Sequence, residues 1–346
     1  MTDKIPIVVL TPVKNEDWIL ERFLAATSVF ADLIIVADQR SRDDSVKIAK
    51  SFEKVRLVHI PTEEYDEAFR QKLLIAKARE WMPMKKLLVA LDADEFIAGN
   101  FLQSSDWNLM KNADPGTLFT ANKVDLLYPL SQYINHPPDY LKFAFLDDGI
   151  SGHSGTLVHS HRLPKSPEAR IIHLEDFKII HFARVRRQVY WDKKAYYSML
   201  ENISGSRTLL GRIGHNSNRL HLFLERKRAE NTPNDWIEPW HKEYGINLKE
   251  FKNEPNYQFQ VQIIKLFQKY GEARFFLDDV WDRDWNNTIR ELKEASLIDE
   301  FFVLKGPGIF HKTLTSLAIS LWKIRRMNPV IDNLSLKLMS ILRKLI

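Results

Sequence analysis

The sequence predicts an α/β fold in which helices flank a mostly parallel central sheet, followed by a mainly helical C-terminal extension. Short continuous apolar runs recur over residues 5–91, and segments with helical spacing of apolar residues separate them. The 346 residues, of which 45% are hydrophobic and 27% charged, can bury a large core. No glycine precedes Gly99, so the chain lacks the three-glycine turn of an N-terminal dinucleotide-binding fold.

Four apolar runs predict buried strands, and three segments between them predict helices. The runs are rich in β-branched residues, which favour strands. Because they are continuous rather than alternating, they indicate a parallel sheet covered on both faces. In chain order we expect strand Ile5–Leu10, helix Glu16–Phe30, strand Asp32–Ala37, helix Asp44–Phe52, strand Val55–Ile60, helix Tyr65–Trp81 and strand Lys86–Leu91.

Beyond residue 100 the pattern becomes looser and then helical. Strands are expected at Thr117–Leu127 and Tyr140–Leu146, and two short strands over Ala169–Arg184 around a turn at Glu175-Asp176. Helices are expected at Gln188–Asn202, near 258–270 and near 285–296, before a break at Gly306-Pro307-Gly308 and a helical tail.

The lack of cysteine excludes disulfides, thiolate zinc sites, iron–sulfur clusters and cysteine nucleophiles. The apolar run Ile5–Leu10 is too short for a signal peptide, and no run of 18 apolar residues occurs. We therefore expect a cytoplasmic protein without a membrane-spanning segment.

Polar and mostly acidic residues follow three of the predicted strands. Thr11-Pro12-Val13-Lys14-Asn15-Glu16 follows the first, Asp38-Gln39-Arg40-Ser41 the second and Asp92-Ala93-Asp94-Glu95 the fourth. The carboxyl ends of parallel strands lie at one edge of a sheet, where open α/β sheets bind their ligands. The sequence therefore predicts a binding site there. The alternative is that Asn15, Glu16 and Asp38 only cap the structure that follows each strand.

Asp92 and Asp94 are candidate metal ligands. Alternate residues of a strand point to the same side, so we expect both carboxylates on one face. Paired carboxylates without neighbouring His or Cys suit Mg²⁺ or Mn²⁺, which keep open positions for substrate phosphates. The alternative is that the acidic pair caps the next helix.

This ordered set of residues resembles the family 2 glycosyltransferases of GT-A fold, whose central sheet is Rossmann-like. The resemblance covers residues 5–100 well and 101–200 loosely. It departs from the family in the more basic turn after Asp38 and in Gln71-Lys72 after Arg70. It implies that Asp92 lies near the ribose and that Asp94 binds the metal bridging the diphosphate. The residues that it implies for nucleotide-sugar binding are Thr11, Pro12, Asn15, Glu16, Asp38, Arg70 and Asp92.

Some relatives in that family carry a His-Glu pair and then a second histidine at a strand end. His173-Leu174-Glu175-Asp176 followed by His181 matches this pattern loosely. His181 would reach the metal alongside Asp92 and Asp94, and Glu175 or Asp176 would act as the general base on the acceptor. Asp147 and Asp148 are the competing base candidates. The alternative is that both histidines lie in the core and the acids cap a turn.

Two further patterns have both a structural and a functional interpretation. His159 and His161 alternate beside Arg162, which favours a polar edge strand over zinc because no further ligands follow at matched spacing. The basic segment 207–228 is either a solvated helix face or a surface for the phosphates of an acceptor.

From these residues we expect a metal-dependent inverting glycosyltransferase with Mn²⁺ or Mg²⁺ as its cofactor. Its donor would be a nucleoside diphosphate sugar (the resemblance favours a UDP-sugar) and its acceptor a hydroxyl of a glycan or lipid-linked glycan, as in polysaccharide or lipopolysaccharide synthesis. The alternatives are a nucleotidyltransferase acting on a sugar phosphate and a non-enzymatic basic binding module. We expect no nucleic-acid partner, because the strand-end edge is acidic and would repel phosphate without a cation.

The net charge of +5 is concentrated at the C-terminus. Residues 311–346 contain seven Lys or Arg and one acid, so the remainder of the chain is close to neutral. Apolar stripes run from Leu314 to Ile324 and from Leu334 to Leu345, separated at Pro329. Such a segment predicts a peripheral anchor on the anionic cytoplasmic face of the inner membrane, with packing onto the body as the alternative.

These features divide the chain into three expected regions. Residues 1–205 would form the catalytic domain, with a nucleotide-binding half at 1–100 and an acceptor half at 101–205. Residues 206–310 would form a helical extension that lies partly on the acceptor side, and residues 311–346 the basic amphipathic tail.

Overall fold

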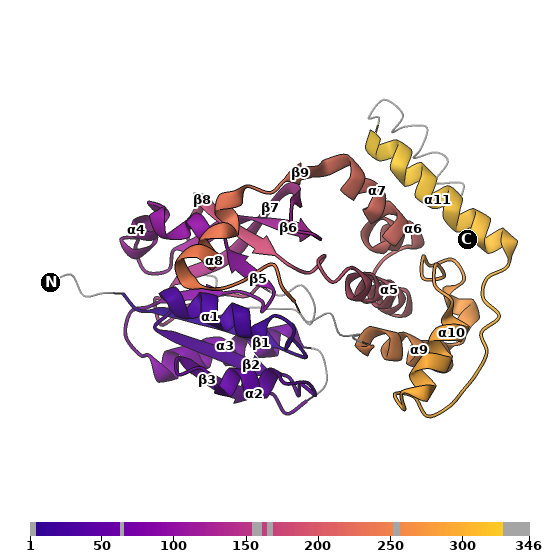
Figure 1. The fold of residues 1–346 in the computed structure, drawn as a ribbon, viewed down its shortest axis with the longest axis horizontal. Helices are drawn as coiled ribbons and strands as arrows, with labels where there is room; N and C mark the ends of the chain where they lie inside the picture. Colours follow the sequence, from indigo (N-terminus) through magenta and orange to yellow (C-terminus); the bar gives the residue numbers. More distant parts are fainter. Residues whose placement is uncertain (1–4, 63–65, 154–160, 165–168, 252–256, 328–346) are drawn as a thin grey trace. The chain divides into compact units, whose positions relative to one another are not determined.

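The computed structural model of the chain describes residues 5–62, 66–153, 161–164, 169–251 and 257–327. The chain forms two compact units (Figure 1). The first unit comprises Met1–Val185 and Glu230–Glu254, and the second comprises Arg186–Ala229 and Pro255–Ile346.

The first unit is built on one mixed sheet with the strand order β3-β2-β1-β4-β7-β6-β8-β5, and β9 pairs with β7. Pairing is parallel from β3 through β4 and between β6 and β8, and it is antiparallel at the other steps of this order. The predicted α/β fold with a mostly parallel sheet is therefore confirmed. The strands are β1 (Ile7–Val13), β2 (Leu33–Asp38), β3 (Val55–His59), β4 (Leu87–Ala90), β5 (Glu95–Ile97), β6 (Leu118–Leu127), β7 (Gln132–Leu146), β8 (Ile171–His181) and β9 (Ala229–Asn231).

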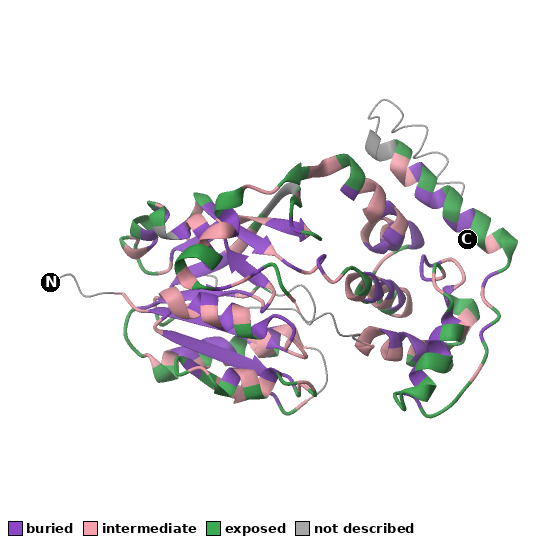
Figure 2. Ribbon diagram, viewed as in Figure 1, coloured by how far each residue is buried: buried purple, intermediate pink, exposed green. Residues whose placement is uncertain are grey.

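Helices cover both faces of the parallel half, which explains its continuous apolar strands. Strand β2 is buried at every residue and β1 at every residue except Pro12 (Figure 2). Val9 packs in the same core as Phe23 of α1, whereas Val8 packs on the other face with Leu74 of α3. The helices of this unit are α1 (Leu20–Phe30), α2 (Ser45–Lys50), α3 (Glu67–Trp81), η1 (Gly99–Gln103), α4 (Asp106–Lys111), η2 (Asn234–Trp236) and α8 (Glu238–Tyr244).

Three strands differ from the sequence prediction. Strand β7 begins at Gln132 rather than at Tyr140. Strand β1 continues to Val13, because its backbone keeps pairing with β2 as far as Asp38. Strand β8 is one strand rather than two with a turn, and its pairing with β6 shifts register between Leu174 and Lys178. Asp106 holds this bulge, since its Oδ2 accepts backbone N–H bonds from Asp176 (3.0 Å) and Phe177 (3.2 Å).

The second unit is helical. Its helices are α5 (Arg187–Ser204), α6 (Leu209–Asn216), α7 (Asn218–Arg228), α9 (Gln258–Tyr270), η3 (Glu272–Phe275), α10 (Trp285–Glu294) and α11 (Ile309–Met327). Ala195 and Met199 of α5 belong to one apolar core with Ile263 and Phe267 of α9. For this reason the units divide at Val185, before α5, and not at the expected residue 205.

A second difference from the expected regions is the return of 230–254 to the first unit. Trp240 is fully buried there, where it stacks on Phe101 with ring centroids 5.0 Å apart and donates a hydrogen bond to the carbonyl of Ile97. Burial of this large aromatic side chain places the segment in the first unit, although helices of the second unit precede and follow it in the sequence.

Three of the six Lys and Arg residues in the basic segment 207–228 pair with acids of their own unit. Arg212 binds Asp278, with 2.6 Å between Nε and Oδ1, and Arg219 binds Asp279 at the same distance. Arg207 binds Glu201 at 2.9 Å. These three arginines join elements of the second unit through ion pairs, a role that neither the solvated helix face nor the phosphate-binding surface anticipated.

The first stripe of the C-terminal tail packs within the second unit. Leu314 and Leu321 of α11 are buried in a cluster with Leu210 and Ile213 of α6, whereas Leu317 and Ile324 are exposed. The stripe from Leu334 to Leu345 lies outside the described residues. Over the described part of the chain, no helix has both the length and the apolar character needed to cross a bilayer.

Candidate functional site

Asp38 closes the carboxyl end of β2. It pairs in register with Val13 of β1 and His59 of β3, so it lies at the predicted edge of the sheet. Its Oδ1 accepts a backbone N–H bond from Ser41 at 3.2 Å, and its Oδ2 lies 3.6 Å from Nδ1 of His59. The side chain is only 4% exposed, so Asp38 stabilises the turn after β2 from a buried position.

The loop after β1 is joined to the loop after β2. Asn15 has a left-handed backbone (φ 56°), its N–H donates to Ser41 Oγ at 2.9 Å, and its Oδ1 accepts from the N–H of Arg42 at 2.8 Å. The N–H of Glu16 donates to Ser45 Oγ at 2.9 Å. The structure therefore brings together the first two predicted binding segments.

Thr11 and Pro12 lie within β1 rather than in the loop that follows it. Thr11 is fully buried, and within the described residues its hydroxyl has no hydrogen-bond partner. Arg70 of α3 does reach the edge, because its Nη1 donates to Oε1 of Gln39, the residue after Asp38, at 3.2 Å.

Asp92 and Asp94 lie in a tight turn between β4 and β5. The expectation of a shared strand face is wrong, since β4 ends at Ala90. The N–H of Glu95 donates to the carbonyl of Asp92 at 2.9 Å, and the N–H of Asp92 donates to Oε2 of Glu95 at 3.1 Å. Both aspartate side chains keep contact with solvent, at 38% and 19% exposure for Asp92 and Asp94. The turn thus presents two carboxylates at the same sheet edge as Asp38, because β4 is the neighbour of β1.

Glu95 is a fully buried acid beneath this turn. Its carboxylate accepts hydrogen bonds from both terminal nitrogens of Arg162, and Nζ of Lys123 lies 3.7 Å from its Oε1. Burial alone would raise the pKa of Glu95, but Arg162 and Lys123 outweigh it and lower the pKa to about 2. The same guanidinium reaches Asp92, with 2.6 Å between Nη2 and Oδ2.

His181 links Asp94 to a second buried acid. It pairs in register with Glu95 on one side and Asp125 of β6 on the other. Its Nε2 lies 3.4 Å from Oδ2 of Asp94, and its Nδ1 lies 2.7 Å from Oδ1 of Asp125. Burial opposes a charged imidazole, but the two carboxylates outweigh burial and raise the pKa of His181 to about 10. Arg184 holds the other oxygen of Asp125 at 2.7 Å.

Asp92 and Asp94 fit a hard divalent cation that is also bound by substrate phosphates. Within the described residues no group of three or more His, Asp and Glu side chains is arranged to enclose a metal. Mg²⁺ and Mn²⁺ are often held by one or two carboxylates together with substrate phosphates, and Asp92 and Asp94 meet that requirement. His181 is oriented by Asp125 and, with its pKa raised to about 10, contacts Asp94 as a cation.

The predicted bases Glu175 and Asp176 are not brought to this turn. Both are exposed at the bulge of β8, and Oδ2 of Asp176 accepts a hydrogen bond from Ser104 at 3.2 Å. At about 3.3 Å per strand residue, they lie on the order of 15 Å along β8 from His181. His173, also upstream in β8, contacts Thr120 and the ring of Tyr140.

Asp148 lies at the opposite edge of the sheet. Strand β7 is antiparallel to β4, with Leu146 opposite Leu87, so Asp147 and Asp148 follow β7 at the amino end of β4. Asp148 accepts hydrogen bonds from Ile150 and Ser151, and Asp147 binds Arg79. The sheet therefore separates Asp148 from the Asp92–Asp94 turn.

Sequence reasoning missed three members of this cluster, Glu95, Asp125 and Arg162. Asp125 is a lone acid between apolar residues of a predicted strand, which is a usable signal for a buried functional acid. Arg162 was expected on an edge strand; instead it binds Asp92 and Glu95. His159 lies outside the described residues.

Comparisons with known proteins give partial matches. No protein-family model and no curated protein matches the chain. Among solved structures, a segment is similar to 4-diphosphocytidyl-2C-methyl-D-erythritol synthase, with 20% identity, TM-score 0.22, and coverage of 26% of this chain and 47% of that one. Another is similar to glucosyl-3-phosphoglycerate synthase from Mycobacterium tuberculosis, solved with Mn²⁺, UDP and phosphoglyceric acid, with 18% identity, TM-score 0.25, and coverage of 34% and 43%. The chain spans less than half the length of each of these structures.

Proposed function

We propose that the chain is a metal-dependent inverting glycosyltransferase of GT-A type that transfers a sugar from a nucleoside diphosphate donor to a hydroxyl of a glycan or glycolipid. One observation carries the proposal. The Asp92–Asp94 turn, the Asp38 turn and the Asn15 loop all follow adjacent parallel strands, so they share the sheet edge where α/β folds bind nucleotides.

The residues of this edge divide by their chemistry. The joined loops at Asn15 and Asp38, with Arg70 behind them, would hold the nucleoside. Asp92 and Asp94 would hold Mn²⁺ or Mg²⁺ with the diphosphate, and the bound cation would offset the charge that develops on the leaving group. His181 would hold Asp94 in place through its contact with Asp125.

Glu175, Asp176 and Asp148 receive no role in proton transfer under this proposal. All three lie away from the Asp92–Asp94 turn, whereas a general base must come within hydrogen-bond reach of the proton that it removes. A glycosyltransferase that uses one of these acids would lose turnover when that acid becomes its amide.

The test compares Asp94→Asn with Asp148→Asn, which change carboxylates at opposite edges of the same sheet. UDP-, GDP-, CMP- and dTDP-sugars are screened with and without Mn²⁺ by thermal shift, and donor hydrolysis is measured for the donor that stabilises the protein. Asp94→Asn should lower metal-dependent hydrolysis by about 100-fold or more, as expected for lost charge stabilisation of a transition state, and Asp148→Asn should keep it. Full activity in Asp94→Asn would contradict the proposal.

We also propose a peripheral membrane contact for the segment beyond α11. Leu314 and Leu321 of the first stripe pack on α6, so the proposal concerns the basic, apolar residues from Leu334 to Leu345. A chain that lacks 328–346 should lose cosedimentation with anionic vesicles. Unchanged sedimentation would refute the anchor.

A further inference from the structure

Arg162 holds one of the two carboxylate oxygens of Asp92. Its Nη2 lies 2.6 Å from Oδ2 of Asp92. Within the described residues, Oδ1 of Asp92 makes no hydrogen bond or ion pair, and the side chain of Asp92 is 38% exposed. Asp92, one of the two carboxylates proposed to hold the cation, therefore presents one oxygen to a ligand while the protein itself uses the other.

The guanidinium that makes this contact is fixed by a buried acid. Nη1 and Nη2 of Arg162 donate to the two oxygens of Glu95, which is fully buried. Such a two-point contact sets the plane of the guanidinium as well as its position. The backbone is anchored beside it, because the neighbouring Leu163 is buried in an apolar cluster with Leu118. Nη2 is therefore directed at Asp92 by groups that lie beneath the turn.

The backbone of Asp92 is held by the same acid. Its N–H donates to Oε2 of Glu95 at 3.1 Å, so Glu95 fixes the main chain of Asp92 directly and its side chain through Arg162. A rotation that turned both oxygens of Asp92 toward one ligand would break the contact with Nη2. Hydrogen bonds between ionised partners are among the stronger ones in proteins. The turn is therefore set for binding through one oxygen of Asp92.

Divalent cations differ in what they require from a carboxylate. Mg²⁺ and Mn²⁺ favour about six ligands in octahedral geometry, and substrate phosphates and water supply most of them beside one or two carboxylates. Ca²⁺ takes about six to eight oxygens and often both oxygens of one carboxylate. With Oδ2 held by Arg162, Asp92 meets the first requirement and not the second.

We infer that Arg162 determines the cation selectivity of the Asp92–Asp94 turn, because its hold on Oδ2 of Asp92 favours Mg²⁺ and Mn²⁺ over Ca²⁺. This inference rests on the proposed function, since it takes Asp92 and Asp94 as the cation's ligands. Selectivity of this kind comes from excluding the competing ligand rather than from a new contact with the preferred one. The charge of Arg162 lowers the affinity for every divalent cation, whereas its hold on Oδ2 acts against Ca²⁺.

The test measures the preference of the protein for Mn²⁺ over Ca²⁺ in the presence of UDP. Binding of Mn²⁺ is followed through the electron paramagnetic resonance signal of the free aqueous ion, relative to UDP without protein, and Ca²⁺ is added as the competitor. This measurement requires no turnover. A merely structural defect would weaken both cations together, so the ratio of the two affinities reports on the hold on Asp92.

The decisive variant combines Arg162→Met with Glu95→Gln. It removes one positive and one negative charge, so the net charge of the cluster is unchanged and no buried acid is left without its partner. Because Oδ2 of Asp92 is then released, the preference for Mn²⁺ over Ca²⁺ should fall by about tenfold. Arg162→Met alone should lower the preference to a similar degree and also tighten both cations, because it removes a positive charge beside their ligand.

Arg79→Met is the matched control. It removes an arginine–aspartate pair at the opposite sheet edge, where Asp147 keeps Lys86 as a partner at 2.6 Å. Both affinities and their ratio should equal those of the unmodified protein.

The outcomes distinguish this inference from the proposed function. If the unmodified protein binds no Mn²⁺ with UDP, or if Asp94→Asn binds it equally well, both are overturned. If Asp94→Asn abolishes Mn²⁺ binding but the double variant keeps the preference of the unmodified protein, the inference alone is overturned. Equal affinities of the unmodified protein for Ca²⁺ and Mn²⁺ would also overturn the inference alone. A lowered preference in the double variant with an unchanged control supports it.

Discussion

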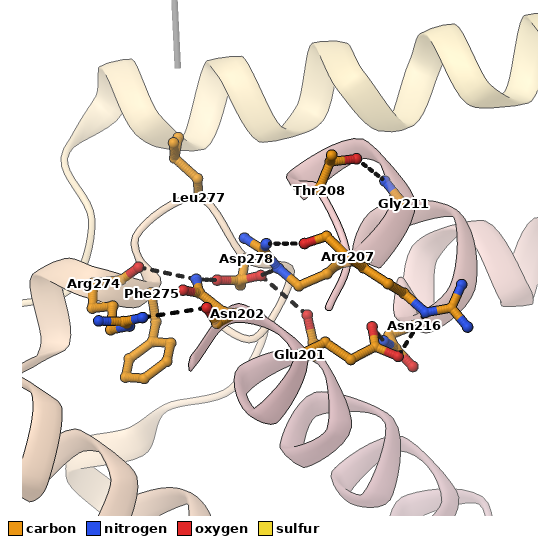
Figure 3. Close-up of polar contacts among 12 residues, drawn as sticks. Glu201, Asn202, Arg207, Thr208, Gly211, Asn216, Arg274, Phe275, Leu277 and Asp278 are labelled. Atoms are coloured by element: carbon orange, nitrogen blue, oxygen red, sulfur yellow. Dashed lines mark hydrogen bonds and ion pairs between the residues drawn. The ribbon is translucent and has the colours of Figure 1, made fainter. Parts of the chain in front are cut away.

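The Asp278 cluster of the second unit and the Asp92–Asp94 turn of the first unit both pair aspartates with cationic side chains, but they differ in how much carboxylate surface stays exposed. In the second unit Asp278 accepts a hydrogen bond from Asn202 at 2.5 Å (Figure 3). It also accepts hydrogen bonds from Ser198 at 3.1 Å and from Arg212 at 2.6 Å. Its side chain is 1% exposed. In the first unit, Asp92 and Asp94 also contact cationic side chains, yet they keep 38% and 19% of their surface.

The difference shows that residue type alone does not separate a structural cluster from a binding site. Asp278, in the loop before α10, joins that loop to α5 and α6, and Arg212 in turn donates a hydrogen bond to the carbonyl of Arg207. Every oxygen of that carboxylate is used within the protein. The Asp92–Asp94 turn retains exposed carboxylate surface, which is what a ligand requires.

The largest expected effect is the loss of stability when Asp278 is removed from its buried cluster. Asp278→Ala leaves Arg212 buried without its carboxylate, so it should lower the free energy of unfolding of the second unit by about 3–5 kcal/mol. Urea denaturation followed by far-ultraviolet circular dichroism measures this. Mn²⁺ binding should persist in conditions where the variant is folded. A loss below about 1 kcal/mol would show that the cluster is not the structural counterpart described here.

The next largest effect is a change in Mn²⁺ affinity when His181, beside the exposed Asp92–Asp94 turn, is replaced. His181→Gln should tighten Mn²⁺ binding by about tenfold, because it removes a positive charge that lies 3.4 Å from the Asp94 carboxylate. Asp125 keeps Arg184 as a partner, so stability should fall far less than in Asp278→Ala. Isothermal titration with Mn²⁺ measures the first quantity and urea denaturation the second. Unchanged Mn²⁺ affinity would remove His181 from the site.

The smallest expected effect is on how stability depends on pH. The comparison is between Asp278 and Asp147, and Asp147 binds Arg79 and Lys86 at the amino end of β4. Burial would raise the pKa of Asp147, but hydrogen bonds from Arg79 and Lys86 outweigh it and lower the pKa below 3.8. Burial raises the pKa of Asp278 above 3.8 despite Arg212. The two carboxylates should therefore give opposite slopes of stability against pH.

The sign follows from proton uptake. Asp147 contributes stability that is present above pH 3.8 and is lost as the pH falls through its lowered pKa, so the advantage of the unmodified protein over Asp147→Asn should shrink in acid. Asp278 takes up a proton in the folded state first, so stability relative to Asp278→Asn should grow as the pH falls toward 3.8. Urea denaturation between pH 3 and about 6 measures both slopes. Parallel slopes would contradict the comparison.

Much of the first unit could be predicted from the sequence, because its signals are local. The apolar runs of β1, β2 and β4 report burial on both faces, and Asp38 and Asp92 follow from where those runs end. The second half of the sheet was less predictable. Its long strands alternate polar and apolar residues irregularly, and the bulge in β8 resembled a turn because Glu175 and Asp176 are exposed.

The sequence by itself determined the α/β class, the parallel strands and the acidic sheet edge. Each of these depends on the pattern of apolar and polar residues that are neighbours in the sequence. Only the tertiary structure decided which charges meet. Arg162 lies 67 residues from Glu95 and 70 from Asp92, and Asp125 lies 56 residues from His181. Such pairs depend on strand order and on the register of β5, β6 and β8, which no local pattern encodes. The same long-range packing assigned Asp148 to the opposite edge of the sheet and Trp240 to the core of the first unit.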